Sequence, residues 1–398
     1  MSNPPAVAVA GLPSRLAVTR LMLTDFRSYR SLKVEVGPQP VVLSGVNGAG
    51  KTNLLEALSL LAPGNGLRSA RLADLVRRGD DGETRWAVAA SVEAAQGRVE
   101  IGTGRDPERD TDRRLIRIDG ETVRGQAALA EHLNLIWLTP NMDRLFLDGA
   151  PARRRFFDRL VYGVDSGHAR RLGAFQRCMS ARARVLRDGP ADPVWLNAIE
   201  ETMAEHAVAV GAARRDAVQR LQAALGAGAA PFPAVALTIR GHVEDWLDGM
   251  PAVDVEARLR ESLAAARAQD AEAGGATIGP HRSDLEVHHL DKDLPAGQCS
   301  TGEQKMLLVA IVLADARLHA ARGGRVPVLL LDEIAAHLDS AHVAALIEAI
   351  CDLGAQAWLT GTDSSLFARF ESRAQFFTVD GNALAPGRRS PFFGADRP

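Results

Sequence analysis

A glycine-rich stretch at residues 45–52, GVNGAGKT, constrains the fold of this chain more than any other feature. It matches the P-loop pattern G-x-x-x-x-G-K-[ST], which joins a buried strand to a helix. The flanks agree, since Val41-Val42-Leu43 is a short apolar run and leucines follow at helical spacing. Glycines let several backbone N–H groups face one phosphate, and the N-terminus of the helix favours an anion. The stretch predicts an α/β fold with a nucleoside triphosphate site.

Two side chains of the P-loop are predicted to act on the triphosphate and its metal. Lys51 would reach the β- and γ-phosphates, and the Thr52 hydroxyl would be a ligand of Mg²⁺. The alternative is a glycine-rich turn without a ligand, but only four lysines occur in the chain, so a chance lysine here is rare. The predicted cofactors are ATP and Mg²⁺. The nucleotide-binding residues expected in this stretch are Gly45, Val46, Asn47, Gly48, Ala49, Gly50, Lys51, Thr52 and Asn53.

The composition is that of a globular protein without membrane spans or a disulfide framework. The net charge is −2 with 24% charged residues, so any basic surface must be local. Three scattered cysteines without a C-x-x-C pair favour a reducing cytosol and disfavour a metal site. The longest strongly apolar run, residues 306–314, is too short to cross a bilayer. We expect a cytoplasmic protein with no membrane partner, and a disordered lead-in at residues 1–14.

The acidic partners of the P-loop are predicted far downstream, after a second apolar strand at residues 328–331. Asp332 at the end of this strand would hold the Mg²⁺ shell, as a Walker-B aspartate does. Glu333 would position or deprotonate the attacking water. Two acids after a strand also suit the first turn of a helix, where negative charge is stabilised. Together with the P-loop they favour hydrolysis, with Glu333, Asp332 and Lys51 as the catalytic residues.

A third motif lies between the two, at residues 299–305, where CSTGEQK precedes an apolar helix. A serine, a glycine and free N–H groups at a helix start offer an anion site, although Ser300 also suits an ordinary helix cap. The motif resembles the signature of the ATP-binding-cassette superfamily. That resemblance implies that Ser300, Gly302 and Glu303 contact the nucleotide of a partner subunit.

Further positions match or depart from the same superfamily. Leu338-Asp339 resembles its D-loop, which places Asp339 at a dimer seam. Thr360 and Thr362 stand where transporter cassettes usually have a switch histidine. This departure leaves the γ-phosphate sensor unassigned, and a threonine hydroxyl could substitute for the histidine. Asn141 and Asp143 stand near the expected position of the Q-loop glutamine.

The pattern of strands and helices predicts two lobes. Residues 15–150 and 275–385 would form an ATPase head, with a mixed sheet around the P-loop and a smaller antiparallel sheet at residues 84–118. Residues 151–274 would form an inserted arm, with three helices between 152 and 228, a strand at 234–241 and a helix near 253–272. Residues 386–398 would be a tail.

Four segments narrow the resemblance from the cassette superfamily and its SMC-like branch to one family. They are LTDFRSY at 23–29, PNMDRL with GAP and RRRFFD between 140 and 158, TIGPHRSDL at 277–285 and STGEQK at 300–305. In this order they resemble the RecF family of recombination mediators over residues 21–363, essentially the whole chain.

The resemblance implies an ATP-dependent homodimer that binds duplex DNA near single-strand gaps and works with RecR and RecO to load RecA. It also implies weak, slow ATP hydrolysis. Arg27 would touch the phosphates or lie on the surface. The chemistry of His281 and Arg282 stays unassigned.

The arm carries a local excess of arginine. Residues 151–220 hold 13 arginines and 8 acidic residues. Contacts from such arginines to phosphates would give sequence-independent, salt-sensitive DNA binding, although arginines on a helix are often only a solvated face. The DNA-contact candidates are Arg153, Arg154, Arg155, Arg184 and Arg187.

Three other functions remain open from the motifs alone. A transporter ATPase is disfavoured by the separation of about 250 residues between Thr52 and Ser300 and by the missing switch histidine. A small-molecule kinase is disfavoured by the signature and the D-loop. An SMC-like ATPase that gates a nuclease or toxin would differ in failing to bind bare duplex DNA.

Overall fold

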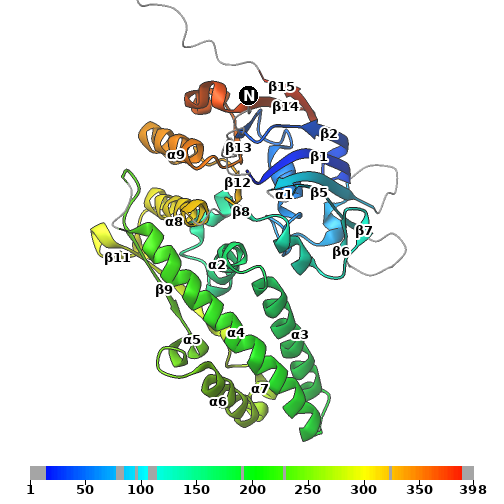
Figure 1. The fold of residues 1–398 in the computed structure, drawn as a ribbon, viewed down its shortest axis with the longest axis vertical. Helices are drawn as coiled ribbons and strands as arrows, with labels where there is room; N and C mark the ends of the chain where they lie inside the picture. The colour runs from blue at the N-terminus through cyan, green and yellow to red at the C-terminus, as the bar shows by residue number, and fades with distance from the viewer. Residues whose placement is uncertain are drawn as a thin grey trace, which may run out of the picture.

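The computed structural model describes residues 15–77, 85–94, 97–105, 114–189, 192–226, 230–321 and 325–387. The lead-in predicted at residues 1–14 and residues 388–398 of the predicted tail lie outside these ranges. Figure 1 shows a sheet-containing head from which a long helical arm extends. This agrees with the predicted α/β fold with a helical insertion.

The head is built around a six-stranded sheet in the order β15-β14-β3-β13-β12-β8, in which only β15 runs antiparallel to its neighbour. Its strands are β3 (Val41–Ser44), β8 (Leu135–Leu138), β12 (Val328–Leu331), β13 (Ala357–Gly361), β14 (Gln375–Asp380) and β15 (Ala383–Pro386). Strands β8, β12 and β13 are buried throughout, as expected for a parallel sheet covered on both faces. The strands predicted at 41–43, 328–331 and 135–138 are therefore confirmed.

Alternate residues of these strands enter two separate cores. One face, including Val41, Leu330 and Trp358, packs on α1 (Lys51–Ser59). The other face, including Val42 and Leu331, packs on the helices α8 (Thr301–Ala321) and α9 (Ser340–Leu353). The period of two in a strand thus places the P-loop helix and the signature helix on opposite faces of one sheet.

A second six-stranded sheet, in the order β2-β1-β4-β5-β6-β7, is antiparallel throughout and shares the core of α1. Its strands are β1 (Ala17–Phe26), β2 (Tyr29–Glu35), β4 (Ala87–Ala94), β5 (Gly97–Arg105), β6 (Arg114–Ile118) and β7 (Glu121–Thr122). This is the predicted antiparallel sheet, extended by the two strands that the alternation before residue 36 predicted.

The arm begins with the three predicted helices, α2 (Ala150–Val164), α3 (His168–Arg187) and α4 (Pro193–Leu225). Helices α3 and α4 lie side by side along its length (Figure 1). The single helix predicted near 253–272 is wrong, because α6 (Ala252–Ala265) and α7 (Arg267–Ala273) are separate helices after the short α5 (His242–Trp246).

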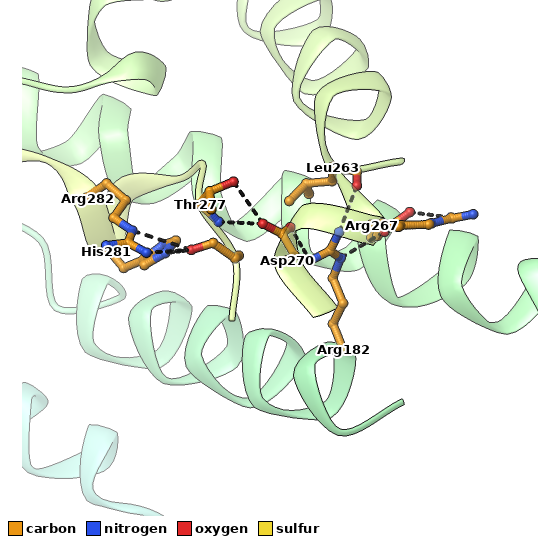
Figure 2. A network of polar contacts seen from close by, with 9 residues as sticks. Arg182, Leu263, Arg267, Asp270, Thr277, His281 and Arg282 are labelled. Atoms are coloured by element: carbon orange, nitrogen blue, oxygen red, sulfur yellow. Dashed lines mark hydrogen bonds and ion pairs between the residues drawn. The ribbon is translucent and has the colours of Figure 1, made fainter. Parts of the chain in front are cut away.

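The break between α6 and α7 coincides with a buried arginine from α3. Arg182 donates from Nη2 to the carbonyl of Leu263 at 2.7 Å, one turn before the break. It also donates from Nη1 to Asp270 Oδ2 in α7 at 2.6 Å (Figure 2). A single guanidinium therefore holds both helices, and a sequence pattern alone gives no sign of it.

A three-stranded sheet in the order β11-β10-β9 connects the arm with the chain that returns to the head. It contains β9 (Val235–Arg240), β10 (Asp284–His289) and β11 (Leu294–Pro295). Strand β9 was predicted near 234–241, whereas its partner β10 was not predicted. Their pairing crosses the boundary predicted at residue 275, and the division into head and arm stays a prediction. Among the described residues, no helix has the length and apolar character needed to span a bilayer.

Candidate nucleotide site and the arm arginines

The P-loop joins β3 to α1, and two of its glycines have no room for a side chain. Gly45 has φ +153°, and a Cβ there would lie 2.3 Å from the carbonyl oxygen of Val379. Gly50 has φ +108°, and a Cβ would lie 2.7 Å from the hydroxyl of Tyr29. That hydroxyl donates to the carbonyl of Gly50 at 3.2 Å. The neighbouring strands thus fix the conformation of the turn and require residues without a side chain at these two positions.

Lys51 begins helix α1 with a side chain that is almost completely buried, at 4% exposure. Its ammonium donates to the carbonyls of Gly45 at 2.7 Å and Val46 at 3.1 Å. The carboxylate of Glu333 lies 3.6 Å away. The positive charge is therefore held against the P-loop by backbone oxygens, in a place where an anion would be strongly attracted.

The two acids after β12 meet the P-loop across the sheet. Thr52 Oγ1 donates to Asp332 Oδ1 at 3.0 Å, although the two residues are 280 positions apart. The hydroxyl of Thr360 donates to the same oxygen at 2.8 Å and accepts from the N–H of Glu333 at 2.8 Å. Glu333 itself has φ +49°, an uncommon backbone conformation for a residue with a side chain.

The oxygens of Thr52 and Asp332 suit a magnesium ion, which prefers hydroxyl and carboxylate ligands. Thr360 keeps the carboxylate of Asp332 in place and orients the turn that carries Glu333. The threonine that stands in the position of the switch histidine is thus bonded to both acids. The ammonium of Lys51 and the carboxylate of Glu333, the acid that could position water, lie next to each other in the lining of the same cavity.

These groups surround an open cavity of about 580 Å³. Its lining includes Arg68 and Pro140, which sequence reasoning did not select, together with Thr362, which it did. The lining residues are Asn47, Gly48, Gly50, Lys51, Thr52, Asn53, Arg68, Pro140, Asp332, Glu333, Ala336 and Thr362. Glycine-rich backbone, two cations (Lys51 and Arg68) and two acids around one cavity fit the phosphates and the metal of a nucleotide.

A second cavity of about 580 Å³ adjoins the P-loop helix and is lined by Arg27, Asn53 and Arg68 among others. Arg27 donates from both Nε and Nη2 to the carboxylate of Glu56, at 2.8 and 2.7 Å. Arg68 donates to Asn53 Oδ1 at 2.8 Å and to Glu56 Oε2 at 3.0 Å. Arg27 thus lies beside the site, and its guanidinium group is bound to the carboxylate of Glu56. Glu56 and Arg68 belong to no sequence motif that would have identified them as residues of the site.

The signature residues cap the N-terminus of α8 with their own side chains, and they do not line the cavity of the P-loop. The N–H of Ser300 donates to Glu303 Oε2 at 2.8 Å, and the N–H of Glu303 donates to Ser300 Oγ at 3.4 Å, a capping box. Lys292 pairs with Glu303 and, by its hydrogen bond, lowers the pKa of that carboxyl to about 2. A Cβ at Gly302 would have only the carbonyl of His337 within 4 Å, at 3.7 Å.

Asp339 caps helix α9, accepting from the N–H of His342 at 2.9 Å, and it is exposed. Asp143 is buried, with the ammonium of Lys305 at 3.7 Å and His337 Nδ1 at 3.5 Å. Asn141 is exposed beside it. Asp339 and Asp143 thus have partners within this chain, and neither lines the described cavity.

Two arginines of the arm are structural rather than available to a ligand. Arg182 and Arg214 are 1% and 2% exposed. Arg214 holds both carboxylate oxygens of Asp158, at 2.9 and 3.0 Å, and the carbonyl of Pro280 at 2.6 Å. Burial alone would raise the pKa of Asp158, but the charge of Arg214 and a hydrogen bond from His168 outweigh it and lower that pKa. Part of the local arginine excess is therefore neutralised inside the fold.

The five DNA-contact candidates fall into two groups. Arg153 holds Asp284 with two hydrogen bonds of 2.8 and 2.7 Å, and Arg154 donates to the carbonyl of Ser283 at 2.5 Å. Both side chains join α2 to the start of β10. The remaining three candidates are exposed, namely Arg155, Arg184 and Arg187.

His281 and Arg282 lie in one short turn, and both side chains point to the same backbone carbonyl (Figure 2). His281 Nε2 is 2.7 Å from the carbonyl of Ala276, and its ring packs on Phe175 with centroids 5.7 Å apart. Burial lowers the pKa of His281. Arg282 reaches the same carbonyl at 3.3 Å. His281 thus takes part in the packing between the turn and α3, and Arg282 braces the turn through the carbonyl of Ala276.

Comparison with known proteins gives a consistent result. The RecF/RecN/SMC N terminal domain family matches residues 17–383. The chain is 48% identical to the DNA replication and repair protein RecF of Mesorhizobium japonicum over 377 residues, which cover 94% of this chain and 99% of that protein. It is 45% identical to the RecF protein of Rhizobium etli over 370 residues, covering 92% and 98%.

Solved structures share the fold. A structure described as the recombination mediator protein RecF-ATPrS in the RecFOR pathway aligns with a TM-score of 0.78 at 19% identity, covering 94% of this chain and 98% of that one. An Smc head domain from Pyrococcus furiosus aligns with a TM-score of 0.52 at 16% identity, covering 93% and 95%. The family match over most of the chain and the close relatives along their full length place this protein in the RecF family of DNA replication and repair proteins.

Proposed function

We propose that this protein is an ATP-dependent DNA-binding protein of recombinational gap repair in the cytoplasm. In this proposal an ATP-bound homodimer clamps duplex DNA near single-strand gaps, and slow hydrolysis resets it. The observation that carries the proposal is the meeting of Lys51, Thr52, Asp332 and Glu333 around one cavity. Membership of the RecF family supports the assignment to repair.

The residues would divide the work on ATP as follows. Lys51 binds the β- and γ-phosphates, because its buried ammonium already faces the P-loop carbonyls. Thr52 and Asp332 would hold Mg²⁺, which when bound neutralises charge on the phosphates. Glu333 orients or deprotonates the attacking water from a turn fixed by Thr360. The product of hydrolysis is ADP and phosphate.

Dimerisation would bring a second chain's signature to the nucleotide. In one chain Ser300, Gly302 and Glu303 lie apart from the cavity of the P-loop, so they are proposed to act on the ATP of the partner subunit. Asp339, exposed at the start of α9, would lie at the seam between the two chains. Binding of both nucleotides then becomes a condition for closing the clamp.

The proposed partners are duplex and gapped DNA, together with RecR and RecO, through which the protein promotes RecA loading. On the arm, the exposed Arg155, Arg184 and Arg187 would contact phosphates. Arg153 and Arg154 would take part in DNA binding through the edge of β10 that they hold.

The test is the molar mass of the Glu333→Gln variant by light scattering, with and without ATP-Mg²⁺ and a short duplex. Without the acid that positions water, the variant should retain ATP, double its mass and co-elute with the duplex. The matched control is Glu333→Gln combined with Gly302→Glu. A side chain at position 302 has room in the monomer, yet its charge would repel the partner's nucleotide.

The control should bind ATP and remain monomeric. A Glu333→Gln protein that binds ATP but stays a monomer, with no DNA retained, contradicts the clamp. If the control dimerises as well as its parent, the dimer does not use the signature helix.

A further inference from the structure

A large groove lies between the head and the arm, away from the nucleotide cavity. Its volume is about 800 Å³. One wall is the loop at residues 63–69, which follows the P-loop helix, with residues 124–131 beside it. The other wall is formed by α2 and the first turns of α3, which lie next to the head (Figure 1). We call this space the inter-lobe groove.

Arginines converge on the groove from both lobes. Arg124 comes from the head, and the others come from α2 and α3 of the arm. The charged residues in the lining are Arg124, Arg155, Arg159, Arg170, Arg177, Asp158 and Glu131. A concave surface with charges of one sign concentrates counter-ions and attracts a polyanion.

The positive charges of the groove are mostly available. Arg124, Arg155, Arg170 and Arg177 are exposed, and none forms an ion pair within the part of the chain that the structure describes. The carboxylate of Asp158 is already bound by Arg214 and by His168. Glu131 is then the one lining acid without such a partner among the described residues, and four exposed arginines outweigh it.

The fifth arginine, Arg159, covers the tryptophan that lines the groove. The guanidinium of Arg159 lies 4.1 Å from the centre of the Trp137 ring. Trp137 is 5% exposed, so a nucleobase cannot stack on it. Burial lowers the pKa of Arg159 to about 10, which still leaves it protonated at neutral pH. Most of the charged groups that line the groove are therefore guanidinium groups.

We propose that the inter-lobe groove binds the phosphodiester backbone of a DNA strand, with Arg124, Arg155, Arg170 and Arg177 contacting the phosphates. This rests on the proposed function and names a surface for it. The tip of the arm is the competing surface, because Arg184 and Arg187 are exposed there on a single helix. The groove is favoured because its arginines converge from two lobes onto one concave surface, so several phosphates of one strand can be held together.

The experiment measures DNA affinity by fluorescence anisotropy between 50 and 200 mM salt, with a non-hydrolysable ATP analogue. Labelled duplex and single strands of equal length serve as probes. The groove variant is Arg170→Gln with Arg177→Gln, and the tip variant is Arg184→Gln with Arg187→Gln. The matched control is Arg240→Gln with Arg260→Gln, which removes two exposed arginines from β9 and α6.

The groove variant should weaken binding by roughly tenfold per arginine, because a hydrogen bond to a charged group contributes about 1.5 kcal/mol or more. Its log–log salt dependence should become shallower by about 2, since each lost phosphate contact removes about 0.9. The control should bind as the unchanged protein does. A loss of affinity for the duplex probe, the single-stranded probe or both supports the proposal. The probe whose affinity falls shows whether the groove binds duplex or single-stranded DNA.

Two outcomes overturn the proposal, and they are distinguishable. If the groove variant binds both probes like the control while the tip variant loses affinity, the groove is not the DNA surface and the proposed function stands. If the unchanged protein binds neither probe, the proposed function fails together with the groove. A melting curve for each variant shows that the fold is retained, because exposed arginines of this kind change stability by about 0.5 kcal/mol or less.

Discussion

In the head, Lys51, Thr52 and Asp332 border an open cavity of about 580 Å³. In the arm, Arg182 and Arg214 are 1% and 2% exposed, and their N–H groups donate hydrogen bonds to residues of the same chain. Both regions combine cations with acids at short distances. They differ in whether space for a ligand remains beside the charges.

That difference separates charges that act on a ligand from charges that hold the fold. Asp158 in the arm and Asp315 in the head are both buried. Arg214 lowers the pKa of Asp158, whereas burial without a cation raises the pKa of Asp315 well above its usual value. The same residue type therefore stabilises one site and strains another, depending on what faces it.

The largest expected effect is the loss of stability in Arg214→Met. The variant leaves Asp158 and Glu244 buried without their cation, which costs roughly 3–5 kcal/mol of unfolding free energy near neutral pH. Because the pKa of Asp158 is lowered in the folded protein, its stabilising contribution is present at neutral pH and lost as the pH falls through the folded value. The deficit should therefore shrink in acid, where the uncompensated carboxyls become protonated.

Urea unfolding at pH 7 and at pH 3, which is below the ordinary aspartate pKa of about 3.9, measures this deficit. The neighbouring Arg215→Met is the control, since its partner Asp248 is exposed and such a pair contributes about 1 kcal/mol or less. Equal losses at positions 214 and 215 would remove the distinction between buried and surface charges.

Lys51→Ala should act on the ligand and leave the fold intact. Its ammonium donates hydrogen bonds only to backbone carbonyls, and the nearby acid, Glu333, is partly exposed. Removing the ammonium therefore does not strand a buried acid, as Arg214→Met would. We expect ATP affinity to fall by about 10- to 150-fold, corresponding to about 1.5–3 kcal/mol for a charged hydrogen bond. Titration calorimetry measures it, with Lys33→Ala, an exposed lysine, as the control. An unchanged affinity would place the triphosphate elsewhere.

Asp315→Asn should stabilise the protein at neutral pH. Both carboxylate oxygens of Asp315 are buried without a hydrogen bond, and His319 at 3.6 Å has its own pKa lowered by burial to about 4. Because the folded pKa of Asp315 is raised, its contribution is lost as the pH rises from about 3.9 towards that raised value. Removing the acid should add roughly 1–3 kcal/mol at pH 7 and little near pH 4.

Melting temperatures of Asp315→Asn at both pH values, beside the exposed control Asp352→Asn, test this. A variant that melts lower than the parent at pH 7 would mean that Asp315 has a partner after all, most simply a protonated His319.

The smallest effect is expected at Asp339, which separates a helix cap from a dimer contact. Asp339→Ala should lower the melting temperature slightly, because it removes the cap of α9, whereas Asp339→Asn should keep the cap. If the residue also lies at the dimer seam, Asp339→Asn should melt normally yet dimerise less with ATP. If Asp339→Asn melts normally and dimerises normally with ATP, Asp339 acts only as a helix cap.

The sequence alone was sufficient where a function depends on neighbouring residues. The P-loop turn is encoded within eight positions, and the acids Asp332 and Glu333 follow directly on an apolar strand. Strands β3, β8 and β12 were predictable because a fully buried strand is continuously apolar. Once those strands run parallel in one sheet, their carboxyl ends must lie along the same edge of the sheet.

Only the tertiary structure decided which arginines are free. In the sequence, Arg182 and Arg184 look alike, yet Arg182 lies between Glu200 and Asp270, 18 and 88 positions away, while Arg184 is exposed. The break between α6 and α7 and the pairing of β9 with β10 depend on such distant partners too. A periodic pattern records which face of an element is buried. The long-range packing determines what a charge meets there, and therefore whether it holds the fold or remains available to a ligand.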